Sequence, residues 1–150
     1  MKHIVAIWHS AGKGKSETVR QLANQFLTLY PSAITVVPTT IPISGDFRLV
    51  IEININGKII TIAFESQGDP GTNIEKRLDY LASKYNCDII FCTCRTRGET
   101  VVAIETVASK YGYDIIWSST YQINGKTNQQ IANRQKADHI IQLLKSLSII

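Results

Sequence analysis

The chain begins with Lys2-His-Ile-Val-Ala-Ile-Trp-His9, continues as Ser10-Ala-Gly-Lys-Gly-Lys-Ser16, and runs on as Glu17-Thr-Val-Arg-Gln-Leu-Ala-Asn24. The short apolar run at the start is typical of a strand buried on both faces of a parallel sheet. Glycine and lysine alternate in the next segment, which predicts a loop whose backbone N–H groups point into one concavity. Apolar residues at helical spacing follow and predict a helix over residues 15–29. Together, these three segments predict an α/β fold with an anion-binding loop near the start of a helix.

This loop resembles the phosphate-binding loop, or Walker A motif, of P-loop nucleoside triphosphatases. The family pattern is a glycine, four residues and Gly-Lys-Ser/Thr, and His9 stands here in place of the first glycine. The resemblance implies that Lys15 reaches the terminal phosphates and that the Ser16 hydroxyl holds Mg2+. It also implies that the phosphates are surrounded by His9, Ser10, Ala11, Gly12, Lys13, Gly14, Lys15, Ser16 and Glu17.

A second segment resembles another part of the same family. Ile62-Ala-Phe-Glu65 is similar to the apolar strand with a terminal acid that follows in P-loop proteins, and Glu65-Ser-Gln-Gly68 is similar to the Asp-x-x-Gly switch of GTPase-like members. In both, glutamate replaces aspartate. The resemblance implies that Glu65 places Mg2+ together with Ser16 and that the Gly68 amide meets the γ-phosphate. Asp69 is the alternative acid for this role, and a solvated strand end is the alternative interpretation of Glu65.

Two arginines follow a later apolar strand. Arg95 and Arg97 lie in Thr93-Cys-Arg-Thr-Arg-Gly98, where positive charge would stabilise a phosphoryl-transfer state or stack on a base. The alternative interpretation is a pair of surface arginines ahead of a helix. The guanine-reading Asn-Lys-x-Asp motif of GTPases is missing, so ATP is expected in preference to GTP.

The rest of the chain predicts the fold. Residues 47–54 and 58–65 flank Asn56-Gly57 and predict a hairpin with a type I′ turn. Ala82-Ser-Lys-Tyr-Asn-Cys-Asp-Ile-Ile90 recurs as Ala108-Ser-Lys-Tyr-Gly-Tyr-Asp-Ile-Ile116, and each copy predicts a helix end, a turn and a buried strand. A helix is predicted over residues 128–147. We therefore expect a three-layer αβα sandwich in one domain, residues 1–150, with a mostly parallel sheet and one antiparallel strand from the hairpin.

Net charge, cysteine count and the length of the apolar stretches limit the ligands and the cellular compartment that we expect. The net charge is +4 and the pI is near 9.0, without a run of Lys or Arg, which suits an anionic ligand and gives no evidence for nucleic-acid binding. Three cysteines, an odd number, favour a reducing compartment and buried thiols. The apolar stretch Ile4–Trp8 is too short for a signal peptide or a membrane span. We expect a cytoplasmic protein that does not bind membranes.

These observations lead to one functional expectation with two alternatives. The chain is expected to bind a Mg2+–nucleoside triphosphate and to hydrolyse it. The first alternative is a small-molecule kinase with Arg95 and Arg97 on the acceptor, and the second is a non-catalytic module that senses nucleotide or binds a protein partner. A narrower resemblance, over about ten residues, is to corrinoid adenosyltransferases, whose loop also contains Gly-Lys-Gly-Lys and also lacks the first glycine.

Overall fold

One six-stranded sheet forms the centre of the computed structural model, which describes residues 1–8, 15–37, 41 and 45–150. The strands are β1 (Lys2–Trp8), β2 (Ile34–Val37), β3 (Arg48–Ile55), β4 (Lys58–Glu65), β5 (Ile89–Cys94) and β6 (Tyr113–Ser119). The helices are α1 (Lys15–Leu29), α2 (Ile74–Lys84), α3 (Glu99–Tyr111) and α4 (Lys126–Ser146). The predicted α/β class is confirmed.

The sheet is mostly parallel. Its order is β2-β3-β4-β5-β1-β6, and β1 pairs in parallel with both β5 and β6. Strand β4 pairs in parallel with β5, whereas β3 runs antiparallel to β2 and β4. The single reversed strand therefore comes from the hairpin, as predicted. Strand β5 lies between β1 and β4, so the two strands that lead into the motifs are not neighbours.

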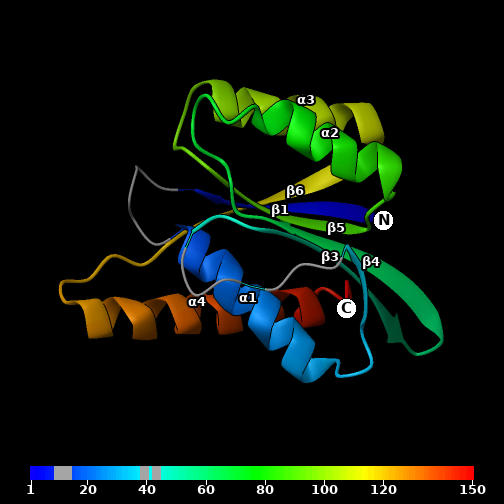
Figure 1. Ribbon diagram of the computed structural model, residues 1–150, viewed down its shortest axis with the longest axis horizontal. Helices are drawn as coiled ribbons and strands as arrows, with labels where there is room; N and C mark the ends of the chain where they lie inside the picture. Colours follow the sequence, from blue (N-terminus) through cyan, green and yellow to red (C-terminus); the bar gives the residue numbers. More distant parts are fainter. Residues whose placement is uncertain (9–14, 38–40, 42–44) are drawn as a thin grey trace.

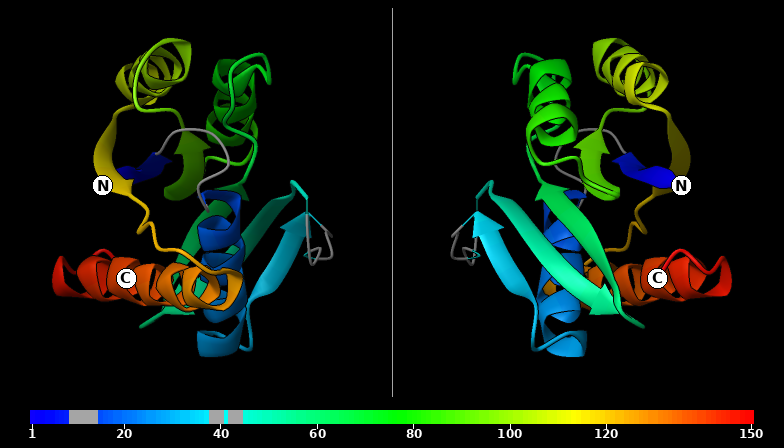
Figure 2. Two further views of the ribbon diagram at one scale, coloured as in Figure 1. Left: turned by 90° about the vertical axis from the view of Figure 1, so that its left-hand side faces the viewer. Right: turned by 90° about the vertical axis from the view of Figure 1, so that its right-hand side faces the viewer.

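Two pairs of helices cover the sheet, one pair on each face (Figures 1 and 2). Helices α1 and α4 pack on one face, where Phe26 of α1 contacts Phe64 and Phe91 of the sheet and the three ring centroids lie 5.1 to 5.7 Å apart. Helices α2 and α3 cover the other face over a second apolar cluster. This arrangement is compatible with a three-layer sandwich. None of the helices in the described part of the chain combines the length and apolar character needed to cross a membrane.

The hairpin between β3 and β4 has the predicted turn. Asn56 and Gly57 both have positive φ, 52° and 86°, as a type I′ turn requires. The turn fixes the register, so that Arg48 lies opposite Glu65 at the far end of the hairpin. This register decides which loop residues meet beyond the strand ends.

The chain leaves the adjacent strands β1 and β5 in opposite directions. Helix α1 follows β1 on one face of the sheet, and α3 follows β5 on the other (Figure 1). In open α/β sheets a crevice forms at such a point, beyond the carboxyl ends of the strands. Trp8, Ser16 and the segment 95–98 belong to this edge of the sheet.

Candidate functional site

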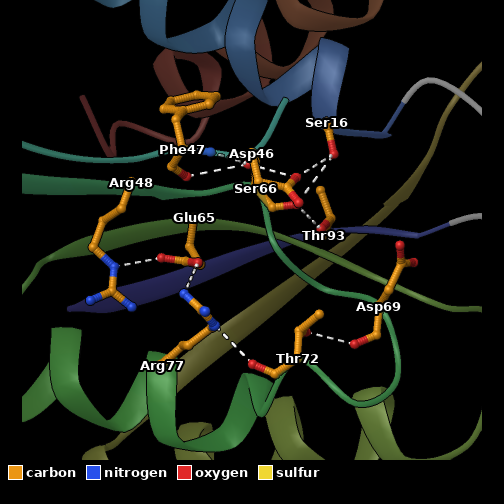
Figure 3. A network of polar contacts seen from close by, with 10 residues as sticks. All are labelled: Ser16, Asp46, Phe47, Arg48, Glu65, Ser66, Asp69, Thr72, Arg77 and Thr93. Atoms are coloured by element: carbon orange, nitrogen blue, oxygen red, sulfur yellow. Dashed lines mark hydrogen bonds and ion pairs between the residues drawn. The ribbon is translucent and has the colours of Figure 1, made fainter. Parts of the chain in front are cut away.

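Hydroxyl groups from three elements meet at the carboxyl edge of the sheet. The Ser16 Oγ, in the first turn of α1, lies 3.3 Å from the carbonyl oxygen of Ser66, the residue after β4. The Thr93 hydroxyl, in β5, donates to the same carbonyl at 2.7 Å. Both Ser66 and Thr93 are buried. Figure 3 shows the three side chains together at the end of α1, so the last residue of the Gly-Lys loop is attached to the ends of two strands.

Asp46 joins these residues, although the sequence analysis did not single it out. Its Oδ1 lies 3.4 Å from the Ser16 Oγ and accepts a hydrogen bond from the Ser66 hydroxyl at 3.1 Å. The Phe47 N–H donates to the Ser66 Oγ at 2.7 Å, and the Ser66 N–H donates to the Phe47 carbonyl at 3.2 Å. We call Ser16, Asp46, Ser66 and Thr93 the hydroxyl cluster. One signal pointed to Asp46: it is the single acid in the segment 38–46 that leads into the hairpin.

A buried arginine on α1 holds the residues next to Asp46. Arg20 is ion-paired with Glu17 one turn earlier and donates from Nη2 to the Gly45 carbonyl at 2.5 Å. Its guanidinium also lies over the Phe47 ring, 5.9 Å from the centroid. Glu17, expected among the phosphate-loop residues, therefore contacts Arg20. Together these contacts attach both chain neighbours of Asp46 to α1.

Gly68 packs directly against β5. A Cβ atom at this position would lie 1.7 Å from the Thr93 carbonyl oxygen and 2.4 Å from its Oγ1. Only glycine allows the backbone after β4 to approach β5 so closely. The structure thus gives Gly68 a packing role beside the hydroxyl cluster, which the sequence analysis did not anticipate.

Glu65 lies on the opposite face of the sheet from the hydroxyl cluster. Its side chain is 1% exposed, and its two carboxylate oxygens pair with Arg48 Nε at 2.6 Å and Arg77 Nη1 at 3.2 Å. Figure 3 shows the carboxylate pointing toward the two arginines and away from Ser16. Consecutive strand residues point to opposite faces, so Ser66 rather than Glu65 faces α1. Within the described residues, Asp46 is the carboxylate that the structure brings to Ser16.

The other charged residues expected in the site, Asp69, Arg95 and Arg97, lie in the loops after β4 and β5. Asp69 is exposed and its Oδ1 accepts from Arg95 Nε at 2.9 Å, while the Arg95 backbone N–H donates to the Thr100 hydroxyl. This ion pair joins the loop after β4 to the loop after β5. Arg97 is exposed at the start of the turn into α3. The structure therefore brings Arg95 and Asp69 together.

The remaining predicted residues are placed only in part. His9, Ser10, Ala11, Gly12, Lys13 and Gly14 lie outside the described residues, and Lys15 begins α1. The roles expected for them remain predictions. Their neighbours on both sides, Trp8 and Ser16, belong to the described part of the chain at the carboxyl edge of the sheet.

Both tryptophans of the chain line one small pocket beside this edge. Trp8 ends β1 and Trp117 lies in the adjacent strand β6; Arg95 and the first turns of α3 complete a cavity of about 220 Å³. Trp117 is 40% exposed. Trp8 directly precedes His9 in the sequence.

The described residues contain no group of three or more His, Cys, Asp or Glu side chains that could hold a metal by themselves. Cys87, Cys92 and Cys94 form no disulfide and are buried, as predicted. Burial raises the pKa of Cys87 to about 12 and raises the pKa of Cys92 well above its ordinary value. The thiols of Cys87 and Cys92 are therefore protonated at neutral pH.

Comparisons with protein-family models, with curated proteins and with solved structures find no match for this chain. The chemistry of the site is therefore inferred from the arrangement of its residues.

Proposed function

We propose that the chain binds a nucleoside triphosphate together with Mg2+, prefers ATP to GTP, and hydrolyses it. The observation that carries the proposal is the position of Ser16. This residue ends the Gly-Lys-Gly-Lys-Ser segment, lies in the first turn of α1, and is beside the Asp46 carboxylate at the carboxyl edge of a mostly parallel sheet. A helix N-terminus with a Gly-Lys loop favours phosphate groups, and this edge is where ligands bind in open α/β sheets.

The residues at this position fit Mg2+. The ion prefers hard oxygen ligands and is commonly held by one or two carboxylates together with substrate phosphates and water. The hydroxyl cluster offers the Ser16 hydroxyl and the Asp46 carboxylate, 3.4 Å apart. Asp46 is exposed and so remains accessible to an ion. Bound Mg2+ would neutralise charge on the phosphates during transfer.

Residues of the chain would bind the phosphates, position the loops and stabilise the developing charge. Lys15 and the loop N–H groups would hold the terminal phosphates, and the Gly68 amide would donate to the γ-phosphate. Ser66 and Thr93 would hold Ser16 and the loop after β4 in place through the contacts already described. Arg95, held by Asp69, would place positive charge beside the transferred phosphoryl group.

The proposal is tested by measuring thermal stability and phosphate release with Mg-ATP, Mg-GTP and their non-hydrolysable analogues. A ligand that binds only the folded chain, at 100-fold excess over its Kd, adds about 2.7 kcal/mol of stability. We expect this gain with Mg-ATP, a smaller gain with Mg-GTP, and none in Lys15→Ala. Retention of the gain in Lys15→Ala, or no gain with any nucleotide, would contradict the proposal.

Asp46→Asn tests the metal assignment separately. Removing the charge while keeping the shape should weaken Mg-ATP binding about ten-fold or more, and nucleotide without Mg2+ should bind the variant and the wild type equally. Asp138→Asn, an exposed carboxylate on α4, is the matched control. Equal Mg2+ dependence in both variants would contradict a role for Asp46.

The same measurements separate the alternatives. A hydrolase releases phosphate without an acceptor, a kinase releases almost none until its acceptor is supplied, and a binding module gains stability without turnover.

A further inference from the structure

A second pocket lies on the α2 face of the sheet, at the same edge but on the opposite side from the hydroxyl cluster. Its volume is about 380 Å³, within the usual range for small-molecule sites. It is lined by the start of β3, the segment before α2 and the first turns of α2, through Arg48, Thr72, Asn73, Lys76, Arg77 and Tyr80. We call it the α2 pocket.

The α2 pocket is strongly basic. Three of its six lining residues are the cations Arg48, Lys76 and Arg77, and none is acidic. Among the described residues, the carboxylate paired with the two arginines is that of Glu65, which is buried behind them. Three cations against one carboxylate leave a positive excess that faces the cavity.

Arg48 and Arg77 are held in place by hydrogen bonds that use only some of their N–H donors. Arg48 uses its Nε on Glu65, and Arg77 uses its Nη1 on Glu65 and its Nε on the Thr72 carbonyl at 2.8 Å. An arginine carries five N–H donors, so most of those on Arg48 and some of those on Arg77 make no hydrogen bond within the described part of the chain. Arginines fixed in this way lose little entropy when they bind an anion.

One wall of the pocket is aromatic. The Arg48 guanidinium lies over the Tyr80 ring, 5.3 Å from its centroid, and the Lys84 ammonium lies 5.2 Å from the same ring. Tyr80 is 38% exposed. A ligand that joined an anionic group to a planar ring would therefore meet cations and an aromatic surface in one cavity.

We propose that the α2 pocket binds a small organic phosphate, with the phosphate on Arg48, Lys76 and Arg77 and the organic part against Tyr80. Arg forks match phosphate oxygens in pairs, and Lys adds a point charge. This site is distinct from the proposed nucleotide site and does not depend on it. Glu65 is a positioning residue for the two arginines, which accounts for a buried acid that the hydroxyl cluster does not use.

The experiment measures binding of phenyl phosphate by calorimetry, in the wild type and in Lys15→Ala, which lacks the main cation of the nucleotide site. We expect saturable binding with the same Kd in both. Lys76→Gln should weaken it about ten-fold, because the exposed Lys76 contributes charge and no contact that the fold needs. Lys58→Gln, an exposed lysine at the hairpin turn, should leave the Kd unchanged.

Two further variants test the contacts with the phosphate and with the organic part separately. Arg77→Lys retains the charge but loses the fork, and should weaken binding several-fold while the chain stays folded. Tyr80→Ala should weaken phenyl phosphate and leave inorganic phosphate unaffected. No saturable binding to the wild type, or binding lost in Lys15→Ala and unchanged in Lys76→Gln, would overturn the proposal.

Discussion

Glu65 and Ser66 are consecutive residues at the end of β4, yet they belong to two different environments. Ser66 faces α1, where its carbonyl accepts hydrogen bonds from Ser16 and Thr93 and its hydroxyl donates to the carboxylate of the exposed Asp46. Glu65 faces α2 and is enclosed by two arginines, with 1% of its surface exposed. On one side of the sheet the carboxylate of Asp46 is accessible and lies among hydroxyl groups. On the other side the charge of the Glu65 carboxylate is already neutralised by two arginines.

This difference shows how a strand divides the roles of neighbouring residues. Because side chains alternate between the faces of a sheet, two consecutive residues of one motif point to opposite sides, and here Glu65 points away from Ser16. An acid that already satisfies two arginines is costly to redirect to an ion, since breaking a buried pair leaves charge without a partner. An exposed acid beside a hydroxyl carries no such cost.

The largest loss of stability is expected for a substitution of Gly68, which packs against β5 between the two environments. In Gly68→Ala the new Cβ would collide with the Thr93 carbonyl, so the loop after β4 must move away from β5. We expect a loss of about 3 kcal/mol or more in the free energy of unfolding, measured in urea. The control is Gly71→Ala, where φ is 84° but no atom lies within 4 Å of the added Cβ, and the loss should be about 1 kcal/mol. Equal losses would mean that the close approach of Gly68 does not stabilise this edge.

The next largest effect is a difference in stability between variants of the two carboxylates, Glu65 and Asp46. Glu65→Gln should cost about 2 kcal/mol in urea unfolding, less than the roughly 3–5 kcal/mol of a fully buried pair because Arg48 and Arg77 are partly exposed. Asp46→Asn should change stability by about 0.5 kcal/mol or less, since Asp46 is exposed. The exposed Glu105→Gln on α3 serves as control. A larger loss in Asp46→Asn than in Glu65→Gln would reverse the comparison.

A smaller effect is expected from the Ser66 hydroxyl. Ser66→Ala leaves the Phe47 N–H without its 2.7 Å acceptor and removes a donor to Asp46. An unsatisfied buried donor of this kind costs about 1.5 kcal/mol. Ser83→Ala, at an exposed position on α2, should be neutral in the same measurement. If the two serine variants unfold at the same urea concentration, the hydroxyl cluster adds nothing to stability.

The smallest effect is expected from His3, near the start of β1 at the opposite edge of the sheet, and concerns the pH dependence of stability. Burial lowers the pKa of His3 below its ordinary value of 6.5, and the Asp114 carboxylate opposes this only in part. The unfolded chain therefore takes up the proton at higher pH than the folded chain, so the stability that His3 contributes is complete above pH 6.5 and declines as the pH falls below it. In His3→Asn this dependence should vanish from urea unfolding between pH 5 and 7. A slope that survives the substitution would assign it to another group.

Local patterns in the sequence were enough to predict the elements but not their partners. The apolar spacing of residues 15–29 and the Asn56-Gly57 turn act within a few residues, and both are found as expected. The contact of Arg77 with Glu65 and the placement of β5 between β1 and β4 depend on packing between distant segments. Asp46 was missed for the same reason, because its place beside Ser16 follows from the hairpin register and from Arg20.

The pocket that contains Trp8 and Trp117 has a practical consequence. These are the two tryptophans of the whole chain, and both lie at the carboxyl edge, one of them next in sequence to the Gly-Lys loop. Indole emission responds to the polarity and charge around the ring, and Trp117 is 40% exposed while Arg95 lines the same pocket. The protein thus carries its own optical reporter, and events near this edge can be followed in real time without a label.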